Sequence, residues 1–281
     1  MKINELIYLG PEGSYSDIAK NKFLQYCSKD CRFIPIDSIY KIIRYLIEKN
    51  SDSVVAILPI ENSIEGIVRE TQDNLINLTK FGIHIFAETS LPIKHSLIGY
   101  GCKSQIKTIL SHQQALAQCR EYIYKNWNDN IVTTPVLSTS NAVKSLTKDN
   151  VSISAIGSEY SANLYKIPVI ESNINDEENN TTRFIMLSKI TPSKAEINKV
   201  SLMFSTENKS GALNKVLQVF EKYELNLSYI DSRPSRKELG EYVFYVDFEG
   251  HIDDSTIALA LVDIQPYVKR FEALSQGAIC V

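Results

Sequence analysis

The chain has 281 residues, which is enough for two domains with sizeable hydrophobic cores. Its hydrophobic content of 44% and charged content of 22% are ordinary for a globular protein, and its net charge of −3 provides no general attraction to nucleic acids or anionic membranes. Because the sequence has no apolar run as long as a transmembrane helix and no signal-peptide pattern at its start, we expect a cytoplasmic protein.

The five cysteines indicate neither a disulfide framework nor a metal site. Their number is odd, and none belongs to a Cys-x-x-Cys pair. Cys27 and Cys31 are four residues apart, but no pair of histidines lies near them in the sequence. We therefore expect free thiols and no bound metal.

The first predicted strand, residues 6–9, ends at a Gly-Pro-Glu-Gly turn, residues 10–13. Ser14 opens a helical pattern, and Asp17 three residues later resembles a capping box. A strand, a glycine-rich turn and a helix N-terminus in this order can bind an anion through free backbone amides. The glycine spacing matches neither a dinucleotide fingerprint nor a P-loop, so a small carboxylate site and a plain strand-to-helix turn both remain open.

Strands then alternate with helices, which predicts a parallel sheet. Residues 33–36 and 54–58 are the next two strands, and the second is a continuous apolar run typical of a buried strand. Binding sites in such sheets lie beyond the C-terminal ends of the strands. Small polar residues stand at two of these ends, namely Ser14, Ser16, Asn62 and Ser63. This repetition favours a polar cleft at this edge of the sheet.

The pattern from residue 83 to residue 100 is strand-like, and we interpret it as the crossover into a second lobe. His84 and His95 lie there without a carboxylate or hydroxyl partner at a recognisable spacing, so structural roles are favoured over catalytic ones. Farther on, a strand ends at Ser111 and is followed by a helix that carries Gln118. These two residues are seven positions apart, or two helical turns, so both can face one side.

Strands at residues 131–137 and 154–157 are each followed by a serine helix cap, and a polar loop then returns to a last strand of this region. That strand begins with Thr182, Arg183 and Phe184, which supply a hydroxyl, a guanidinium and an aromatic ring in consecutive positions. Such a group suits the edge of a cleft. On these residues alone, an ordinary strand with an exposed arginine is the simpler interpretation.

A linker at residues 190–194 precedes a segment with a different pattern. Its predicted order is βαββαβ within roughly 80 residues, which indicates a ferredoxin-like sandwich.

Four motifs taken together resemble the prephenate dehydratase family, which makes phenylpyruvate in phenylalanine biosynthesis. They are residues 9–16 (LGPEGSYS), 59–66 (PIENSIEG), 111–119 (SHQQALAQC) and 180–184 (NTTRF). The later segment resembles an ACT domain of the phenylalanine-sensing kind through residues 211–213 (GAL) and 231–234 (DSRP). The chain departs from the family pattern at Gln113, where proline is usual, and at Asp231, where glutamate is common.

The resemblance implies an α/β fold with a two-lobed, periplasmic-binding-protein-like catalytic domain and a C-terminal ferredoxin-like βαββαβ ACT domain. We assign residues 1–189 to the catalytic domain, 190–198 to a linker and 199–281 to the ACT domain. Lobe one is predicted to contain about residues 1–80 with 174–189, and lobe two about residues 81–173. Because no helical extension precedes Leu6, a fused chorismate mutase is not expected.

The implied reaction is the decarboxylating dehydration of prephenate, in which the ring becomes aromatic and no cofactor is needed. Thr182 is implied as the hydrogen-bond donor to the leaving hydroxyl. Arg183 is expected to hold the pyruvyl carboxylate, because an ion pair on the ring carboxylate would stabilise the group that must leave. Phe184 is expected to pack against the substrate ring. The residues expected to orient the hydroxyl and carboxylates are Asn62, Ser63, Ser111 and Gln118, and those expected to assist anion binding by the backbone are Ser14 and Ser16, unless some of them only cap helices.

The ACT resemblance implies feedback inhibition by L-phenylalanine. Gly211, Ala212 and Leu213 are expected to bind the effector carboxylate at a helix N-terminus. Asp231 and Arg233 are expected to complete the effector site. Such domains usually pair across subunits, so we expect a homodimer or homotetramer. A purely structural dimerisation domain remains the alternative.

Other functions remain open at this point. Arogenate, with an amino group in place of the side-chain keto group, is an alternative substrate. A non-catalytic amino-acid sensor or solute receptor is the alternative from a different class, although the combination of Thr182, Asn62 and Gln118 argues for catalysis. A transcriptional effector domain would normally carry a DNA-binding helix pair, and no basic segment of the sequence supports one.

Overall fold

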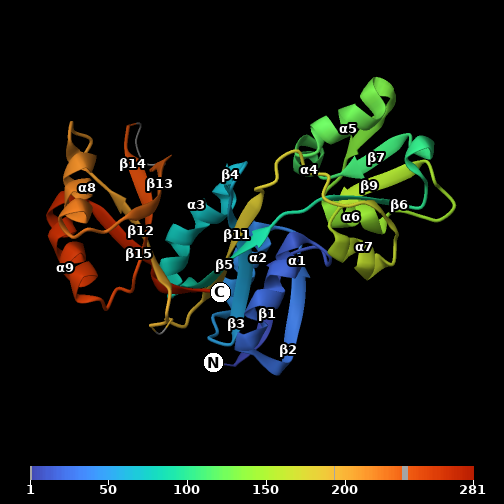
Figure 1. Ribbon diagram of the computed structural model, residues 1–281. Helices are drawn as coiled ribbons and strands as arrows, with labels where there is room; N and C mark the ends of the chain where they lie inside the picture. The colour runs from blue at the N-terminus through green and yellow to red at the C-terminus, as the bar shows by residue number, and fades with distance from the viewer. Residues whose placement is uncertain (1, 193, 236–239) are drawn as a thin grey trace.

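The computed structural model describes residues 2–192, 194–235 and 240–281. The chain forms three parts in a row, with lobe one in the middle, lobe two on one side and a C-terminal domain on the other (Figure 1). Lobe one and the C-terminal domain share a single sheet, whereas lobe two has a sheet of its own. The α/β fold class predicted from the sequence is confirmed.

Lobe one consists of a mixed sheet with helices on its faces. Its strands are β1 (Ile3–Leu9), β2 (Cys27–Ile36), β3 (Val54–Asn62), β4 (Gly66–Ile67), β5 (His84–Pro92) and β11 (Thr181–Ser188). Its helices are α1 (Tyr15–Lys20), α2 (Ile39–Lys49) and α3 (Arg69–Leu78). β1 pairs in parallel with β2 and β3, whereas β11 lies antiparallel between β3 and β5. β11 is therefore a central strand, and Phe184 to Leu187 are buried on both of its faces.

Lobe two is smaller and contains a five-stranded sheet in the order β10-β6-β9-β7-β8. The strands are β6 (Ser96–Gly99), β7 (Thr108–Ser111), β8 (Val132–Pro135), β9 (Ile153–Gly157) and β10 (Val169–Glu171). The helices are α4 (Gln113–Ala117), α5 (Arg120–Trp127), α6 (Thr139–Lys144) and α7 (Glu159–Tyr165). Two neighbouring crossover segments connect the lobes, because the amide of Ile93 donates to the carbonyl of Asn180 and the amide of Ile174 donates to that of His95.

The C-terminal domain has the predicted βαββαβ order. Its elements are β12 (Asn198–Ser205), α8 (Ala212–Lys222), β13 (Leu227–Pro234), β14 (Tyr242–Glu249), α9 (Ser255–Ile264) and β15 (Arg270–Cys280). The strand order β13-β14-β12-β15 is that of a ferredoxin-like sandwich. One face of this sheet packs on α8 and α9 through Phe204, Phe220 and Phe248, while the other face packs against lobe one.

The C-terminal domain joins lobe one through its last strand. β15 pairs in parallel with β5, with Ile279 opposite Ala87 and Cys280 opposite Glu88. The shared sheet therefore runs in the order β13-β14-β12-β15-β5-β11-β3-β1-β2. The C-terminal domain is thus hydrogen-bonded to the strand next to β11.

Two boundaries differ from those expected from the sequence. The strand-like pattern at residues 83–100 is two strands in two sheets, so the chain leaves lobe one after Pro92 and not near residue 81. β5 belongs to lobe one because it pairs with β11 along its length. The C-terminal domain begins at Asn198, one residue before the predicted boundary. The predicted linker includes Ser193, which lies outside the described residues.

The turn after β1 packs directly against lobe two. Gly13 has a φ of +83°, and a Cβ at this position would lie 2.6 Å from Oγ of Ser140. The Ser140 hydroxyl itself donates to the carbonyl of Glu12. Gly66 also has a positive φ, +79°, but a Cβ there would meet no atom within 4 Å. Gly13 therefore meets two requirements. Its positive φ favours glycine, and the close contact between the two lobes leaves no room for a Cβ atom.

We predict that Gly13→Ala destabilises the protein more than Gly66→Ala. Both variants force an L residue into the left-handed region, at about 1–2 kcal/mol each. Only Gly13→Ala must also displace Ser140, which adds roughly 1 kcal/mol for the disrupted hydrogen bond. Thermal unfolding of the two variants measures the difference, and an equal loss of Tm would show that the contact between the lobes contributes nothing at this turn.

Candidate active site

A cleft of about 340 Å³ lies between the two lobes. Residues from several loops and strand ends line it, including Ser14, Tyr15, Ser16, Asn62, His95, His112, Gln114, Gln118, Ser138, Thr139, Thr182 and Phe184. These positions follow strand ends of both sheets, which is where α/β folds place their sites. The volume suits a small organic molecule.

Thr182 and Asn62 form a hydrogen-bonded cross-strand pair on the lobe-one wall. They are opposite each other on β11 and β3, and Nδ2 of Asn62 donates to Oγ1 of Thr182 at 2.9 Å. Oδ1 of Asn62 accepts from the amides of Ile64 and Glu65, which fixes the orientation of the side-chain amide. Since Oγ1 accepts from Asn62, the hydroxyl hydrogen of Thr182 remains available to donate into the cleft.

The polar chain continues from Asn62 across to lobe two. Nδ2 of Asn62 also donates to Oδ1 of Asn180 at 2.7 Å, and Nδ2 of Asn180 donates to Oε1 of Gln118 at 2.8 Å. Nε2 of His95 lies 3.1 Å from the same Gln118 oxygen. Among the described residues, Nε2 of Gln118 is buried without a hydrogen-bond partner. A buried unpaired donor costs about 1–3 kcal/mol, so it marks a place where a ligand acceptor would be stabilising.

His95 is held as a neutral ring. Burial lowers its pKa to about 4, although the hydrogen bond with Gln118 acts in the opposite direction. Nδ1 of His95 lies 3.1 Å from the hydroxyl of Tyr15, and burial raises the pKa of Tyr15, so the phenol keeps its proton. We assign the neutral tautomer with hydrogen on Nε2, because it donates to Gln118 and leaves Nδ1 as the acceptor for Tyr15.

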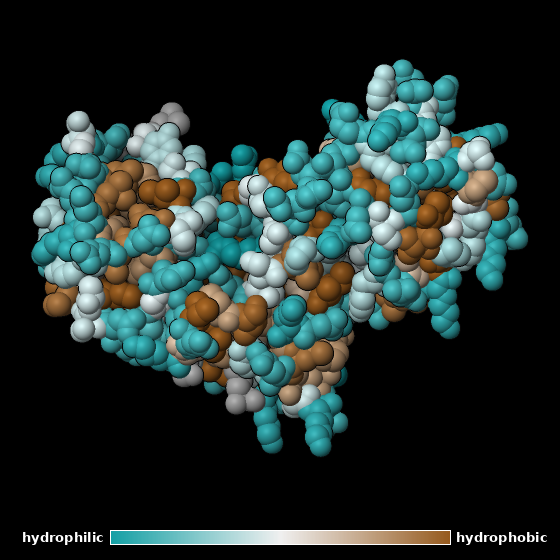
Figure 2. Space-filling model, in the orientation of Figure 1, coloured by the Kyte–Doolittle hydropathy of each residue, from teal (hydrophilic) through white to brown (hydrophobic). Residues whose placement is uncertain are grey.

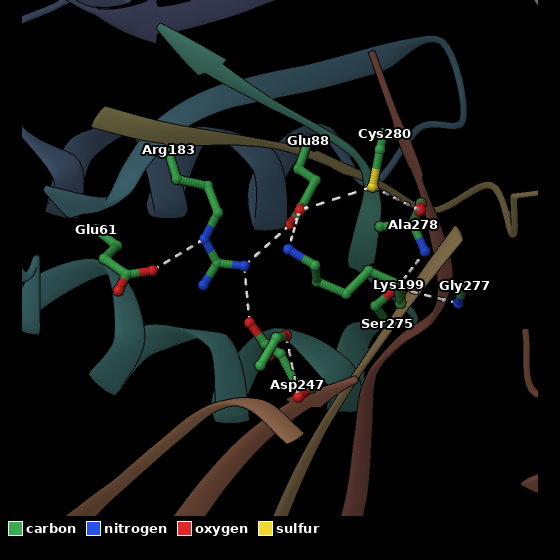
Figure 3. Close-up of polar contacts among 10 residues, drawn as sticks. Glu61, Glu88, Arg183, Lys199, Asp247, Ser275, Gly277, Ala278 and Cys280 are labelled. Carbon is green, nitrogen blue, oxygen red and sulfur yellow. Dashed lines mark hydrogen bonds and ion pairs between the residues drawn. The ribbon is translucent and has the colours of Figure 1, made fainter. Parts of the chain in front are cut away.

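The expectation that Arg183 holds a substrate carboxylate is wrong in this structure. Successive residues of a strand point to opposite faces, so Arg183 points away from Thr182 and Phe184. Its guanidinium contacts Glu61 and Glu88 of lobe one and Asp247 of the C-terminal domain (Figure 3). Burial disfavours the cation, but Asp247, Glu88 and Glu61 outweigh this effect and raise the pKa of Arg183.

Three of the four predicted serines have structural partners. Ser111 is fully buried and donates to the carbonyl of Ile156 at 2.6 Å, so it lies behind the cleft wall. Ser63 is exposed and links the carbonyl of Asn179 to the amide of Thr181. Ser14 lines the cleft, but its hydroxyl accepts from the amide of Asp17 and donates to the carbonyl of Leu9. At these three positions the serine hydroxyl is therefore used to cap a helix or to hold the backbone in place, which is the structural alternative to substrate binding.

Ser16 is buried at the cleft wall, as are Asn62, Gln118, Thr182 and Phe184. The structure thus brings these five predicted residues from the two lobes together in one cleft.

Sequence reasoning missed Tyr15 and His95 as cleft residues. Both residues lie near predicted strand ends, but the contact between them joins two positions that are 80 residues apart in the sequence. The single hydroxyl hydrogen of Tyr15 is shared between Nδ1 of His95 and the carbonyl oxygen of Lys94, which lies 2.7 Å away, and this fixes the crossover segment that carries His95. Only the position of Tyr15 in the first motif, next to Ser14 and Ser16, pointed toward the cleft.

The predicted effector residues of the C-terminal domain do not all meet within one chain. Gly211 has a φ of +78° at the start of α8, is exposed, and has open space at the position of a Cβ. Asp231 and Arg233 lie on the opposite face of the sheet, since Arg233 pairs with Asp73 of α3 in lobe one. Gly211 and the pair Asp231 and Arg233 therefore do not form one site within a single chain, and their assignment to an effector site stays a prediction.

The described residues contain no group of three or more histidine, cysteine, aspartate or glutamate side chains arranged to hold a metal ion. Within the same residues, no helix has the length and apolar character needed to cross a membrane.

Comparisons with known proteins agree with the resemblance found in the motifs. The family model described as Prephenate dehydratase matches residues 6–192, and the model described as ACT domain matches residues 200–264. A protein of Methanocaldococcus jannaschii named Prephenate dehydratase is 43% identical over 250 residues, which is 88% of each chain. An Arabidopsis thaliana protein named Arogenate dehydratase/prephenate dehydratase 2, chloroplastic, is 32% identical over 95% of this chain and 71% of its own length.

The solved structure of prephenate dehydratase from Arthrobacter aurescens in complex with L-Phe has a TM-score of 0.83 with this chain. The two are 29% identical, and the match covers 96% of this chain and 88% of the other. Since the family model covers more than half of the chain and a relative is 43% identical over 88% of both chains, the chain belongs to the prephenate dehydratase family.

Proposed function

We propose that this chain converts prephenate to phenylpyruvate, water and carbon dioxide in L-phenylalanine biosynthesis, and that L-phenylalanine inhibits it by binding to the C-terminal domain. The observation that carries the proposal is the hydrogen bond from Asn62 to Thr182, which aims a hydroxyl donor into the cleft. Family membership supports the same reaction. The proposal includes a catalytic domain through residue 189, a regulatory domain that begins with β12 at Asn198, and a cytoplasmic location.

The proposed chemistry is a fragmentation of the substrate ring. The bond between the ring and its carboxylate breaks, and its electron pair enters the ring as carbon dioxide forms. The ring double bonds shift, and the carbon–oxygen bond breaks with its electron pair on the leaving oxygen. One proton from solvent converts the hydroxide to water. Thr182 donates a hydrogen bond to this oxygen while its negative charge develops, which stabilises the transition state more than the ground state.

Gln118 supplies a second donor in this proposal. Its Oε1 accepts hydrogen bonds from Asn180 and His95, so the amide cannot rotate without losing both. Nε2 is thereby held as a donor without a protein partner among the described residues. We assign it to a carboxylate or keto oxygen of the substrate, because such an acceptor would satisfy the buried amide.

The substrate dianion is bound in this proposal mainly by neutral donors. The described residues that line the cleft include no lysine or arginine. Ser16 and the amides at the start of α1 lie at the wall, where a carboxylate can accept hydrogen bonds from the backbone. Phe184 provides the apolar surface for the ring.

We propose that copies of the chain associate through their C-terminal domains as a homodimer or homotetramer. β13 is an edge strand of the shared sheet, and Ile230 on it is 49% exposed. Hydrophobic residues also gather on the visible face of this domain (Figure 2). Phenylalanine would bind near Gly211, where the backbone at the start of α8 is open to a carboxylate.

The purified protein is expected to form phenylpyruvate from prephenate without added metal or cofactor, and L-phenylalanine is expected to slow the reaction. Absorbance of phenylpyruvate measures turnover with and without the amino acid. Turnover of arogenate alone would reassign the substrate. If folded protein converts neither compound, the enzyme proposal fails and a ligand-binding protein remains.

Thr182→Ala is expected to lower kcat by roughly 100- to 1,000-fold with a much smaller change in KM, because the lost hydrogen bond acts mainly in the transition state. Steady-state kinetics with prephenate measure the effect. Thr182→Ser keeps a hydroxyl at the same position and serves as the control, which we expect to retain most of the activity. A nearly normal kcat in Thr182→Ala would exclude the assigned role.

The free energy of unfolding is expected to fall as the pH decreases from about 6.5 toward 4 partly because of His95. Its pKa is 6.5 without the folded surroundings and about 4 within them, so the unfolded state binds the proton first. This single group destabilises the fold by at most about 1.4 kcal/mol per pH unit in that window and has no effect above it.

Urea unfolding of the wild type and His95→Gln at several pH values tests this expectation. The difference in unfolding free energy between the two proteins should shrink or reverse in favour of the variant as the pH approaches 4. A difference that stays constant from pH 7 to pH 4 would contradict the lowered pKa.

A further inference from the structure

β11 has two different surroundings on its two sides. Thr182 and Phe184 face the cleft, whereas Arg183 between them faces the C-terminal domain. On the neighbouring strand β3, Asn62 faces Thr182 and Glu61 faces Arg183. The hydrogen-bonded pair in the cleft and the ion pair behind it are therefore successive cross-strand pairs of one ladder.

The group behind the cleft, which we call the interdomain cluster, contains Arg183, Glu61, Glu88, Asp247 and Lys199 (Figure 3). Nη1 of Arg183 lies 2.7 Å from Oδ2 of Asp247 and 3.0 Å from Oε2 of Glu88. Nζ of Lys199 lies 2.5 Å from Oε1 of Glu88. Asp247 and Lys199 come from β14 and β12, so the C-terminal domain supplies one anion and one cation to the cluster.

The cluster is largely shielded from water. The side chains of Arg183, Glu88 and Asp247 are 13%, 7% and 8% exposed. Charge pairs in such surroundings are weakly screened, and removal of one partner leaves the others uncompensated. The position of Asp247 therefore has a strong influence on the position of the Arg183 side chain.

The packing around the cluster leaves room for a rearrangement. Nε of Arg183 lies 3.2 Å from Glu61 but makes no hydrogen bond with it or with any other described residue. A small cavity of about 20 Å³, enough for about one water molecule, adjoins Arg183 and Asp247. The register of β11 against β3 also shifts between Arg183 and Phe184, and such bulges re-aim side chains beside active sites.

We propose that Arg183 and Asp247 are positioning residues for Thr182, through which the C-terminal domain controls the proposed reaction. When Asp247 holds Arg183, the Arg183–Glu61 pair keeps β11 and β3 in the register that lets Asn62 orient the Thr182 hydroxyl. A displacement of the C-terminal domain withdraws Asp247, and Arg183 then shifts toward Glu61 and Glu88. This moves the strand segment beside Thr182 without any direct contact between the effector and the cleft. The inference rests on the proposed dehydratase activity.

The test uses Asp247→Asn in the full chain, with Asp263→Asn as the matched control. Asp263 pairs with Lys222 within the C-terminal domain, so its substitution removes an acidic partner of an ion pair without touching β11. Asp247→Asn is expected to lower kcat by about 10- to 100-fold, as a misplacement of catalytic groups does, with little change in KM and weaker inhibition by phenylalanine. Asp263→Asn is expected to keep wild-type kinetics.

Arg183 is tested by Arg183→Lys and Arg183→Met. The lysine variant keeps the charge and is expected to retain part of kcat, whereas the methionine variant is expected to match Asp247→Asn. The double variant Arg183→Met/Asp247→Asn is expected to be no slower than Arg183→Met alone, because both changes remove the same connection.

Hydrogen exchange of the β11 amides provides a readout that does not depend on turnover. We expect faster exchange at residues 181–184 in Asp247→Asn than in Asp263→Asn. Loss of stability with an unchanged kcat and unchanged β11 exchange would overturn the proposal and leave a purely structural cluster. Wild-type protein without turnover would instead refute the dehydratase activity, and the exchange result would still decide whether Asp247 positions β11.

Discussion

The hydrogen bond between Asn62 and Thr182 is the interaction on which the cleft depends. It forms only because β11 returns antiparallel along β3 and places residues 120 positions apart opposite each other. The same amide holds Asn180, which in turn orients Gln118 of lobe two. The geometry of both proposed donors thus follows from one cross-strand pair, and any change in the register of β11 affects both lobes.

β11 owes its importance to its place in the shared sheet. It is buried on both faces and pairs with β3 on one side and β5 on the other, while β5 also pairs with β15 of the C-terminal domain. A central strand cannot slip by one residue without moving its apolar side chains to the wrong face. The strand is therefore a stable support for a donor, yet only one strand, β5, separates it from the C-terminal domain.

Much of this arrangement was predictable from the sequence, because it depends on local patterns. Alternating strands and helices indicated the α/β fold, and polar residues at strand ends indicated a cleft that includes Asn62. The roles of Gln118 and Thr182 came from the resemblance of their motifs to a known family. Arg183 was misplaced because three consecutive residues were assigned to one site, although strand geometry separates neighbours onto opposite faces. His95 and Tyr15 were missed because their contact depends on how the crossover folds back on the first turn. Ser111 was misassigned because a strand end does not reveal which side chains face the interior.

The position of Arg183 outside the cleft has a chemical consequence for the proposed reaction. A guanidinium beside the ring carboxylate would stabilise the anion that has to become neutral carbon dioxide, and this ground-state stabilisation would raise the barrier. Neutral donors such as Gln118 orient a carboxylate with less stabilisation of its charge. The oxygen that gains negative charge is instead assigned to Thr182, whose hydroxyl donates to it. The cleft can then favour departure of both groups at once, because the guanidinium of Arg183 lies behind β11, where it pairs with Glu61, Glu88 and Asp247 and not with the substrate.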